Sequence, residues 1–137
     1  MRILRRVMAI AVGLGFMAAT VTVGTLLASA ISGAPQSDNA AAPPGASTVI
    51  LLLDLVVCAV GAVLGGWLAA RIASFAPYGH ASVMAAIIAV LSATVSVAPT
   101  PGEPGWYPSA VALTAVVGIL LGGKLRAAAA AGERVIA

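Results

Sequence analysis

The residue of this sequence best placed for chemistry is Asp54, an acid inside an otherwise apolar stretch. A carboxylate in hydrocarbon is costly, so an acid in such a stretch usually faces the protein interior and has a partner. Helical spacing puts Cys58, Gly61 and Gly65 on the same face as Asp54. We therefore expect Asp54 to point into a helix interface rather than toward lipid.

Hydroxyl groups at a similar depth in the other apolar stretches are candidate partners for Asp54. They belong to Thr22 or Thr25, Ser92 or Ser96, and Thr114. One interpretation makes this polar layer a site that binds a cation or relays a proton. The other makes Asp54 a protonated group that hydrogen-bonds hydroxyls across helices and fixes their register. The sequence has no second acid or base at this depth, which favours the structural interpretation.

The remaining reactive side chains do not form a recognisable catalytic or metal site. The single cysteine excludes both an intrachain disulfide and a thiolate metal cluster, and the single histidine, His80, lies at the border of an apolar stretch. Phosphate-binding loops, nucleophile elbows and dinucleotide fingerprints are absent from the sequence. We expect no enzyme activity, no cofactor and no metal.

The elements that must position these residues are hydrophobic helices. Of the 137 residues, 61% are hydrophobic and 8% are charged, whereas a soluble domain is about a quarter charged. A helix of about 20 apolar residues spans a bilayer, and four stretches qualify: about 7–31, 48–70, 81–98 and 109–125. The sequence therefore predicts one all-α domain, residues 1–137, built as an antiparallel bundle of four transmembrane helices.

Two terminal features bear on this prediction. The first stretch ends in an Ala-x-Ala pattern at residues 28–30 that is typical of signal-peptide cleavage, but its apolar run exceeds the roughly 7–15 residues of a signal peptide. We therefore expect the first helix to be retained. The alanine-rich tail, 126–137, is expected to extend the last helix into the cytoplasm until Gly132 interrupts it.

The basic residues give the bundle a direction. All seven lie at one end of the four stretches: Arg2, Arg5, Arg6, Arg71, Lys124, Arg126 and Arg134. Since short loops rich in Lys and Arg stay in the cytoplasm, both termini are expected there, with the chain in the inner membrane. The aromatic and basic residues predicted to anchor the two membrane surfaces are Trp67, Arg71, Trp106 and Tyr107. The bases indicate lipid headgroups rather than nucleic acid as partners.

A glycine-rich pattern, G-x-x-L-G-G-x-L-x-A, occurs twice at a spacing of 57 residues. Its glycines are Gly61, Gly65 and Gly66 in the second stretch, and Gly118, Gly122 and Gly123 in the fourth. Either the chain contains two duplicated hairpins related by an axis along the membrane normal, or its simple composition produces the match. In both cases glycines four apart form faces on which helices approach closely. Spacing alone leaves open whether these faces meet within one chain or between copies.

Four segments carry a resemblance to known proteins: Gly65–Ala73, His80–Ala81, Gly105–Pro108 and Leu121–Leu125. Through them the chain resembles a group of small, uncharacterised bacterial four-helix integral membrane proteins. The resemblance implies four spanning helices and supplies no activity. Small multidrug exporters also have four helices, but their signature acid lies in the first helix, where this sequence has none.

Different functions are compatible with these features. We expect a structural or accessory inner-membrane protein that packs through its glycine faces, as a homo-oligomer or as a subunit of a larger membrane complex. The alternative is a small channel or transporter that uses Asp54 and the Ser/Thr layer for cation or proton passage. A lipid-binding or envelope-stress role is not separated from the first function by sequence.

Overall fold

The chain is all-α in the computed structural model, which describes residues 2–32, 48–73, 77–95 and 104–136. The helices are α1 (Arg2–Ser32), α2 (Thr48–Ala73), α3 (Pro77–Val95) and α4 (Tyr107–Ile136). Three of them contain stretches long and apolar enough to cross a membrane, at Val7–Gly24, Thr48–Ala73 and Tyr107–Gly132. The apolar part of α3, Tyr78–Thr94, is shorter. The all-α prediction with four helices is confirmed, three of the helices are long and apolar enough to span a membrane, and a fourth crossing stays a prediction.

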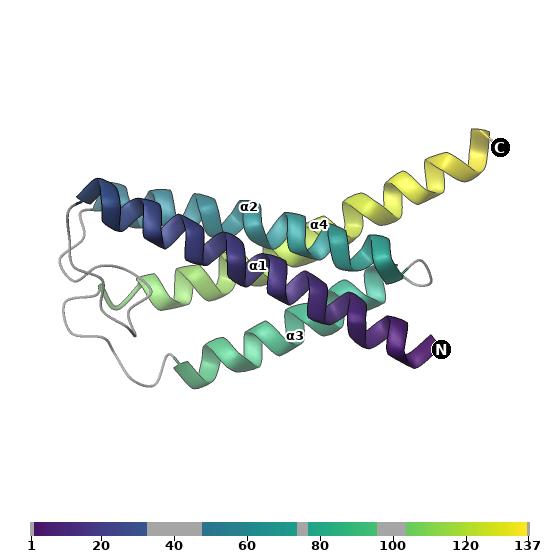
Figure 1. Cartoon of the computed structure of the whole chain (residues 1–137), viewed down its shortest axis with the longest axis horizontal. Coiled ribbons are helices and arrows are strands. Elements are labelled where there is room, and N and C mark those ends of the chain that lie inside the picture. Colours follow the sequence, from purple (N-terminus) through teal and green to yellow (C-terminus); the bar gives the residue numbers. More distant parts are fainter. Residues whose placement is uncertain (1, 33–47, 74–76, 96–103, 137) are drawn as a thin grey trace.

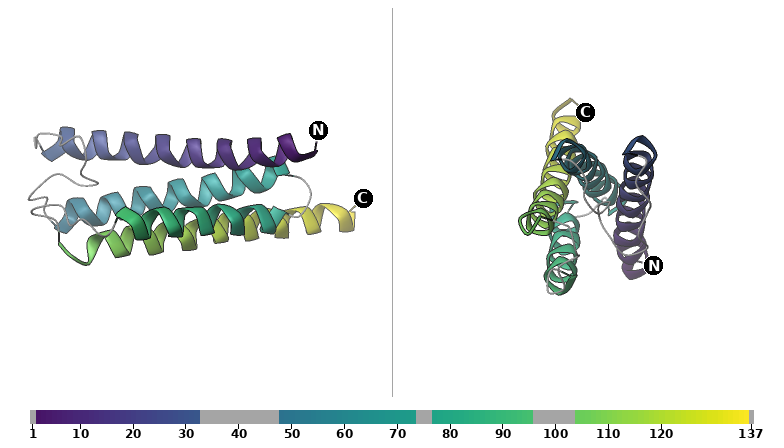
Figure 2. Two further views of the ribbon diagram at one scale, coloured as in Figure 1. Left: turned by 90° about the horizontal axis from the view of Figure 1, so that it is seen from below. Right: turned by 90° about the vertical axis from the view of Figure 1, so that its left-hand side faces the viewer.

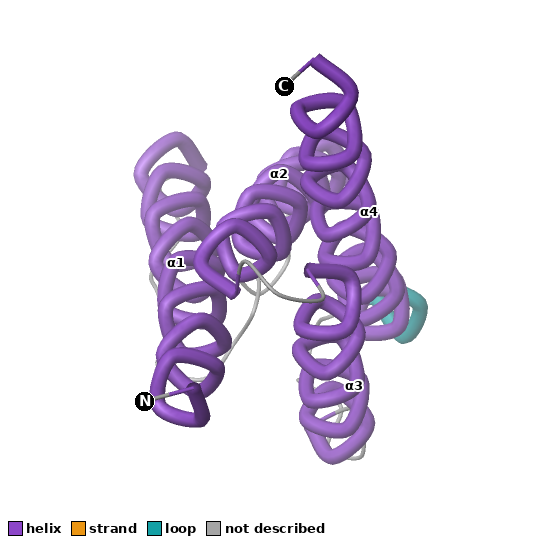
Figure 3. The backbone as a smooth tube through the Cα atoms, turned by 90° about the vertical axis from the view of Figure 1, so that its right-hand side faces the viewer, coloured by secondary structure: helices purple, strands orange, loops and turns teal. Residues whose placement is uncertain are grey.

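Helix α2 is the centre of the bundle. It packs along both α1 and α4, while α3 packs mainly on α4 and meets α1 over a short length. Helices α1 and α3 are apart over most of their length, so the bundle is open between them (Figure 3). Helices α2 and α4 run in one direction, and α1 and α3 run in the other (Figure 1). Both ends of the chain consequently lie at the same end of the bundle (Figure 2).

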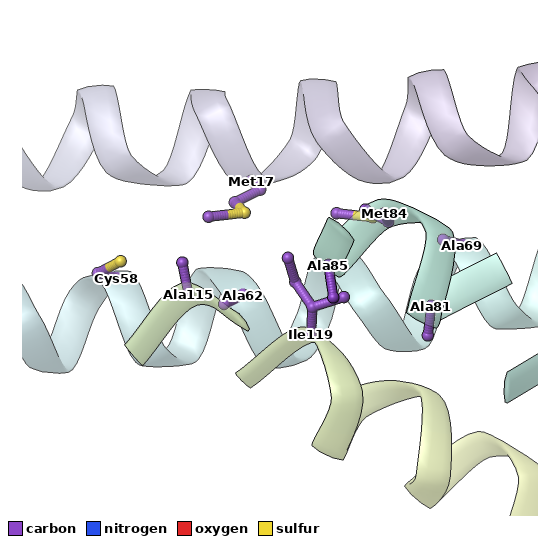
Figure 4. Packing of buried hydrophobic residues seen from close by; sticks show 9 residues of the cluster. All are labelled: Met17, Cys58, Ala62, Ala69, Ala81, Met84, Ala85, Ala115 and Ile119. Atoms are coloured by element: carbon purple, nitrogen blue, oxygen red, sulfur yellow. The ribbon is translucent and has the colours of Figure 1, made fainter. Parts of the chain in front are cut away.

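The interior is made of small residues, and the surface is made of large apolar ones. Most of the buried hydrophobic residues are alanines, and the largest fully buried side chains are Leu51, Met84, Tyr107 and Ile119. Figure 4 shows the central cluster, in which α1, α2, α3 and α4 meet through Met17, Ala62, Met84 and Ile119. Many leucines and valines are instead half or more exposed, such as Leu113 at 65%. Helices that associate in lipid use small residues in this way, because close backbone approach increases their dispersion contacts.

Two glycines of α4 set its contact with α2. A methyl group added at Gly118 would lie 2.7 Å from Ala62 Cβ, and one added at Gly122 would lie 2.7 Å from Trp67 N and would also meet the Val63 carbonyl. These contacts put Gly118 level with the Ala59–Val63 turn of α2 and Gly122 level with the Val63–Trp67 turn. The two copies of the glycine-rich pattern therefore lie side by side on parallel helices.

The two copies nevertheless use different neighbours. Gly61 and Gly65 face α1, where an added methyl would lie 3.0 Å from Thr20 Cγ2 and 2.9 Å from the Gly13 carbonyl oxygen. Gly118 and Gly122 face α2 instead. An exact two-fold relation between hairpins would give both pairs equivalent neighbours, so the packing does not follow that symmetry. The glycine faces that the sequence left unassigned meet within one chain.

Helix ends differ from the predicted ones for local reasons. The third helix was expected to begin at about residue 81, but α3 begins at Pro77, whose fixed φ suits a helix start and whose missing N–H is not needed there. Helix α3 is described as far as Val95, and the predicted end at residue 98 lies outside the described residues. Helix α4 continues through Gly132 to Ile136, because the alanines before it favour helix strongly. Its last turns extend beyond the other helices (Figure 1).

Candidate functional site

The buried acid is bound by a tyrosine of the same chain. Asp54 is 8% exposed on α2, and the hydroxyl of Tyr107, which is fully buried at the start of α4, donates a hydrogen bond to its Oδ2. Hydrogen bonds to a carboxylate are among the stronger ones in proteins. The pair joins the two parallel helices near the ends opposite to the chain termini.

A turn before α4 determines where Tyr107 lies. The Tyr107 amide donates to the Pro104 carbonyl at 2.9 Å, and the Ala110 amide donates to the Trp106 carbonyl at 3.0 Å. Trp106 is thus the residue whose carbonyl accepts the first bond of the helix. Pro108 follows in the first turn, where a residue without an N–H leaves no intrahelical bond unmade. This rigid entry positions Tyr107 as the first residue of α4.

Apolar side chains enclose the pair. Tyr107 packs with buried Leu51, and the half-buried Leu55 and Val111 complete this small cluster. The ring of Trp106 meets the ring of Tyr107 edge to face, with centroids 5.8 Å apart. Trp106 is itself 47% exposed, so it lies between the pair and the surroundings. Because an uncompensated polar group is costly in such an enclosure, the tyrosine hydroxyl stabilises the buried acid.

The interior beyond the pair is apolar. Cys58, one helical turn further along α2, is buried and belongs to the central cluster with Ala115, Met17 and Ile119. Met84 fills the next layer. Asp54 is the only acid among the side chains that the structure describes. In the described core, the polar pair is therefore followed by hydrocarbon rather than by a chain of polar groups.

No family model, curated protein or solved structure matches this chain. The resemblance to small bacterial membrane proteins accordingly rests on the sequence segments alone. The structure itself shows four helices, of which three are long and apolar.

The described members of the predicted hydroxyl layer, Thr22, Ser92 and Thr114, do not gather around Asp54. Thr22 is exposed and donates to the Ala18 carbonyl of its own helix at 2.9 Å. Thr114 lines a groove on the outside of α2 and α4. Ser92 is half-buried on the half of α3 that diverges from α2 (Figures 1 and 3). Ser96 and the side chain of Thr25 lie outside the described residues. The structure thus brings Tyr107 to Asp54, and a role for these hydroxyls in passage stays a prediction.

Sequence reasoning missed Tyr107 because aromatic residues near a helix end were assigned to the membrane surface. A signal was present in the repeat: at a spacing of 57 residues Tyr107 corresponds to Ile50, one helical turn before Asp54. Since helical side chains lean toward the N-terminus, the carboxylate of Asp54 is displaced toward that turn. A long side chain at the start of α4 can then reach it.

The opposite end of α2 holds a second polar contact. The guanidinium carbon of Arg71 lies 5.1 Å from the centroid of the Trp67 ring, the geometry of a cation–π contact. Both residues were predicted as surface anchors, and here they contact each other one helical turn apart. Among the described residues, no three His, Cys, Asp or Glu side chains come together as a metal site would need.

Proposed function

We propose that this chain is a small structural or accessory protein of the inner membrane, crossing it four times with both termini in the cytoplasm. Its large exposed apolar surface and small-residue interior support membrane embedding, because a water-soluble monomer rarely exposes contiguous apolar patches beyond a few hundred Å². The basic residues lie at or near the end of the bundle that carries both termini, which supports the proposed orientation.

The direction of the helices supports a fourth crossing. Helices α2 and α4 run the same way, so a chain that crosses twice in that direction must return between them. Helix α3 is the element between them and runs the opposite way. Its 19 residues measure about 28 Å, close to the roughly 30 Å of a bilayer core. We therefore assign α3 as the return crossing despite its shorter apolar stretch.

The observation that carries the structural role is the hydrogen bond from Tyr107 to Asp54. It satisfies the buried acid within the chain and ties α2 to α4 at one end, while the glycine contacts hold the same helices further along. A transport pathway needs further polar groups in line with the acid. The apolar cluster beyond Asp54 therefore favours a structural joint over cation or proton passage.

The proposed partners are lipids together with further copies of the chain or subunits of a larger complex. The glycines of the repeated pattern on α2 and α4 are covered within the chain, so the assembly surface is proposed elsewhere. The outer face of α1 offers one instead: Ala11, Gly15 and Ala19 are exposed at four-residue spacing, and a methyl added at Gly15 would meet nothing within 4 Å. Small residues so spaced allow a second helix to approach closely.

The structural role is tested by comparing wild type with Asp54→Asn. The amide oxygen of asparagine can still accept the Tyr107 hydroxyl, so we expect unchanged thermal stability in detergent. In liposomes loaded with a pH-sensitive dye, both proteins are expected to leak protons no faster than empty vesicles, and an ionophore provides the positive control. The same comparison with K⁺ and Na⁺ gradients covers cation passage.

A flux that wild type carries and Asp54→Asn loses, while both proteins remain folded, would establish the transport alternative. A large loss of stability in Asp54→Asn without any flux in wild type would also contradict the proposed hydrogen bond, because the substitution preserves an acceptor for Tyr107.

A further inference from the structure

A groove of about 310 Å³ lies between α2 and α4 on the surface of the bundle. Its walls are apolar: Ala59 and Val63 of α2, and Leu113, Val117 and Leu121 of α4, with Thr114 adding one hydroxyl. Leu113 is 65% exposed and Leu121 is 49% exposed, so the groove is open to the surroundings rather than sealed in the core. From Leu113 to Leu121 the lining of α4 extends about 12 Å along the helix.

The groove points toward two basic residues. On α2, Ala59, Val63, Trp67 and Arg71 follow one another at four-residue spacing, in a row that winds gradually around the helix from the groove toward its outer side. On α4, Lys124 lies three residues beyond Leu121 and shares its face. Contact of Gly122 with the Trp67 amide puts Lys124 within about one turn of Arg71 along the bundle.

Two exposed bases lie beyond the groove, Lys124 about one turn past Leu121 and Arg71 about two turns past Val63. Arg71 and Lys124 are both exposed, and Arg71 lies over the Trp67 ring. The one acid among the described side chains, Asp54, is four turns or more away along α2. Parallel helices in contact are about 8–10 Å apart, so one phosphate can lie within reach of both long side chains.

We infer that the groove binds one acyl chain of an anionic phospholipid, with the lipid phosphate between Arg71 and Lys124. Charge complementarity selects the occupant: an apolar slot that ends in two bases matches a lipid tail that ends in a phosphate. The length of the groove along α4 also fits a lipid chain, because about 12 Å is close to the roughly 15 Å thickness of the hydrocarbon in one bilayer leaflet. This inference rests on the membrane orientation proposed above and is independent of whether Asp54 carries flux.

Tryptophan quenching by brominated lipids tests the site. Trp106→Phe leaves Trp67 as the single tryptophan, directly beside the proposed phosphate position. The protein is reconstituted in nanodiscs of phosphatidylcholine containing a small fraction of phosphatidylglycerol or phosphatidylcholine with brominated chains. Each variant is compared with its own unbrominated sample, because removing Arg71 also changes the intrinsic emission of Trp67.

Brominated phosphatidylglycerol is expected to quench Trp67 at concentrations well below those needed for brominated phosphatidylcholine. Arg71→Gln and Lys124→Gln are each expected to reduce that preference about five-fold, the weight of one base near an anionic surface. Arg134→Gln removes the same charge from the end of α4 and is the matched control, expected to keep the preference. Ala59→Phe fills the groove and is expected to weaken quenching by both lipids, with circular dichroism confirming its helical content.

Three results would overturn the inference. Equal quenching by the two brominated lipids would remove the headgroup preference. An equal effect of Arg134→Gln and Lys124→Gln would reduce the preference to general charge attraction. Displacement by excess soluble glycerol phosphate would show that the bases bind phosphate without a lipid chain. If neither lipid quenched Trp67, the proposed membrane embedding of this part of α2 would be wrong.

Discussion

Replacing Gly122 by alanine is expected to destabilise the bundle, because the added methyl group would enter the backbone of α2. It would lie 2.7 Å from Trp67 N and would also meet the carbonyl of Val63. Backbone atoms within a helix cannot turn aside as a flexible side chain can, so α2 and α4 must separate along their contact. Overpacking of this kind costs about 1–3 kcal/mol.

Gly15→Ala is the matched control, since it makes the same chemical change in the middle of a helix. Nothing lies within 4 Å of the added methyl there, and alanine favours helix by about 0.5–1 kcal/mol over glycine. Because the same helix preference applies at Gly122, the two variants should differ by the overpacking cost of about 1–3 kcal/mol, which is at least about five-fold in the ratio of folded to unfolded protein.

The assay is reversible unfolding in mixed micelles, with increasing dodecyl sulfate and far-ultraviolet circular dichroism as the signal. Gly122→Ala is expected to unfold at lower dodecyl sulfate than wild type, and Gly15→Ala at an equal or higher amount. Equal midpoints for the two variants would refute the close contact of α2 and α4, and the repeated glycines would then reflect composition rather than packing.

Two further predictions concern orientation and assembly. Orientation is tested in a Cys58→Ala background by treating intact cells with a membrane-impermeant maleimide. Ser47→Cys is expected to react and Ala131→Cys is expected to resist. Reaction of Ala131→Cys would place α4 in the opposite orientation. Gly15→Leu should abolish crosslinked dimers formed in membranes, whereas Ala86→Leu, an equally exposed change on α3, should not; dimers that survive Gly15→Leu would exclude the outer face of α1 as the assembly surface.

The helices themselves were predictable from the sequence, because long apolar stretches leave few alternatives in lipid. The ends of the helices were less predictable than the helices themselves. The sequence suggests that Pro77 breaks a helix, yet a proline is equally suited to begin one, and only the position of the preceding helix end distinguishes the two cases. Likewise Gly132 carries too small a helix penalty to stop a run of alanines.

The candidate site was predictable only in part. Helical spacing correctly put Asp54 on the buried face with Cys58, Gly61 and Gly65. The identity of its partner depends on how α2 and α4 are rotated about their axes, and residue spacing within one helix contains no information on that rotation. For the same reason the glycine faces were visible in the sequence, while the assignment of Gly61 to α1 and Gly118 to α2 was not.

The most direct test of the structural role is a double-mutant cycle with Asp54→Leu and Tyr107→Phe, measured by the same unfolding in micelles. Tyr107→Phe keeps the ring and removes the donor, and Asp54→Leu replaces the acid by an apolar group of similar size. A joint between α2 and α4 predicts a favourable coupling of about 0.6 kcal/mol, the average for hydrogen bonds between membrane helices, and at most about 1.7 kcal/mol. It also predicts that Tyr107→Phe alone destabilises the protein. A coupling of zero, with Tyr107→Phe as stable as wild type, would contradict the structural role of the pair.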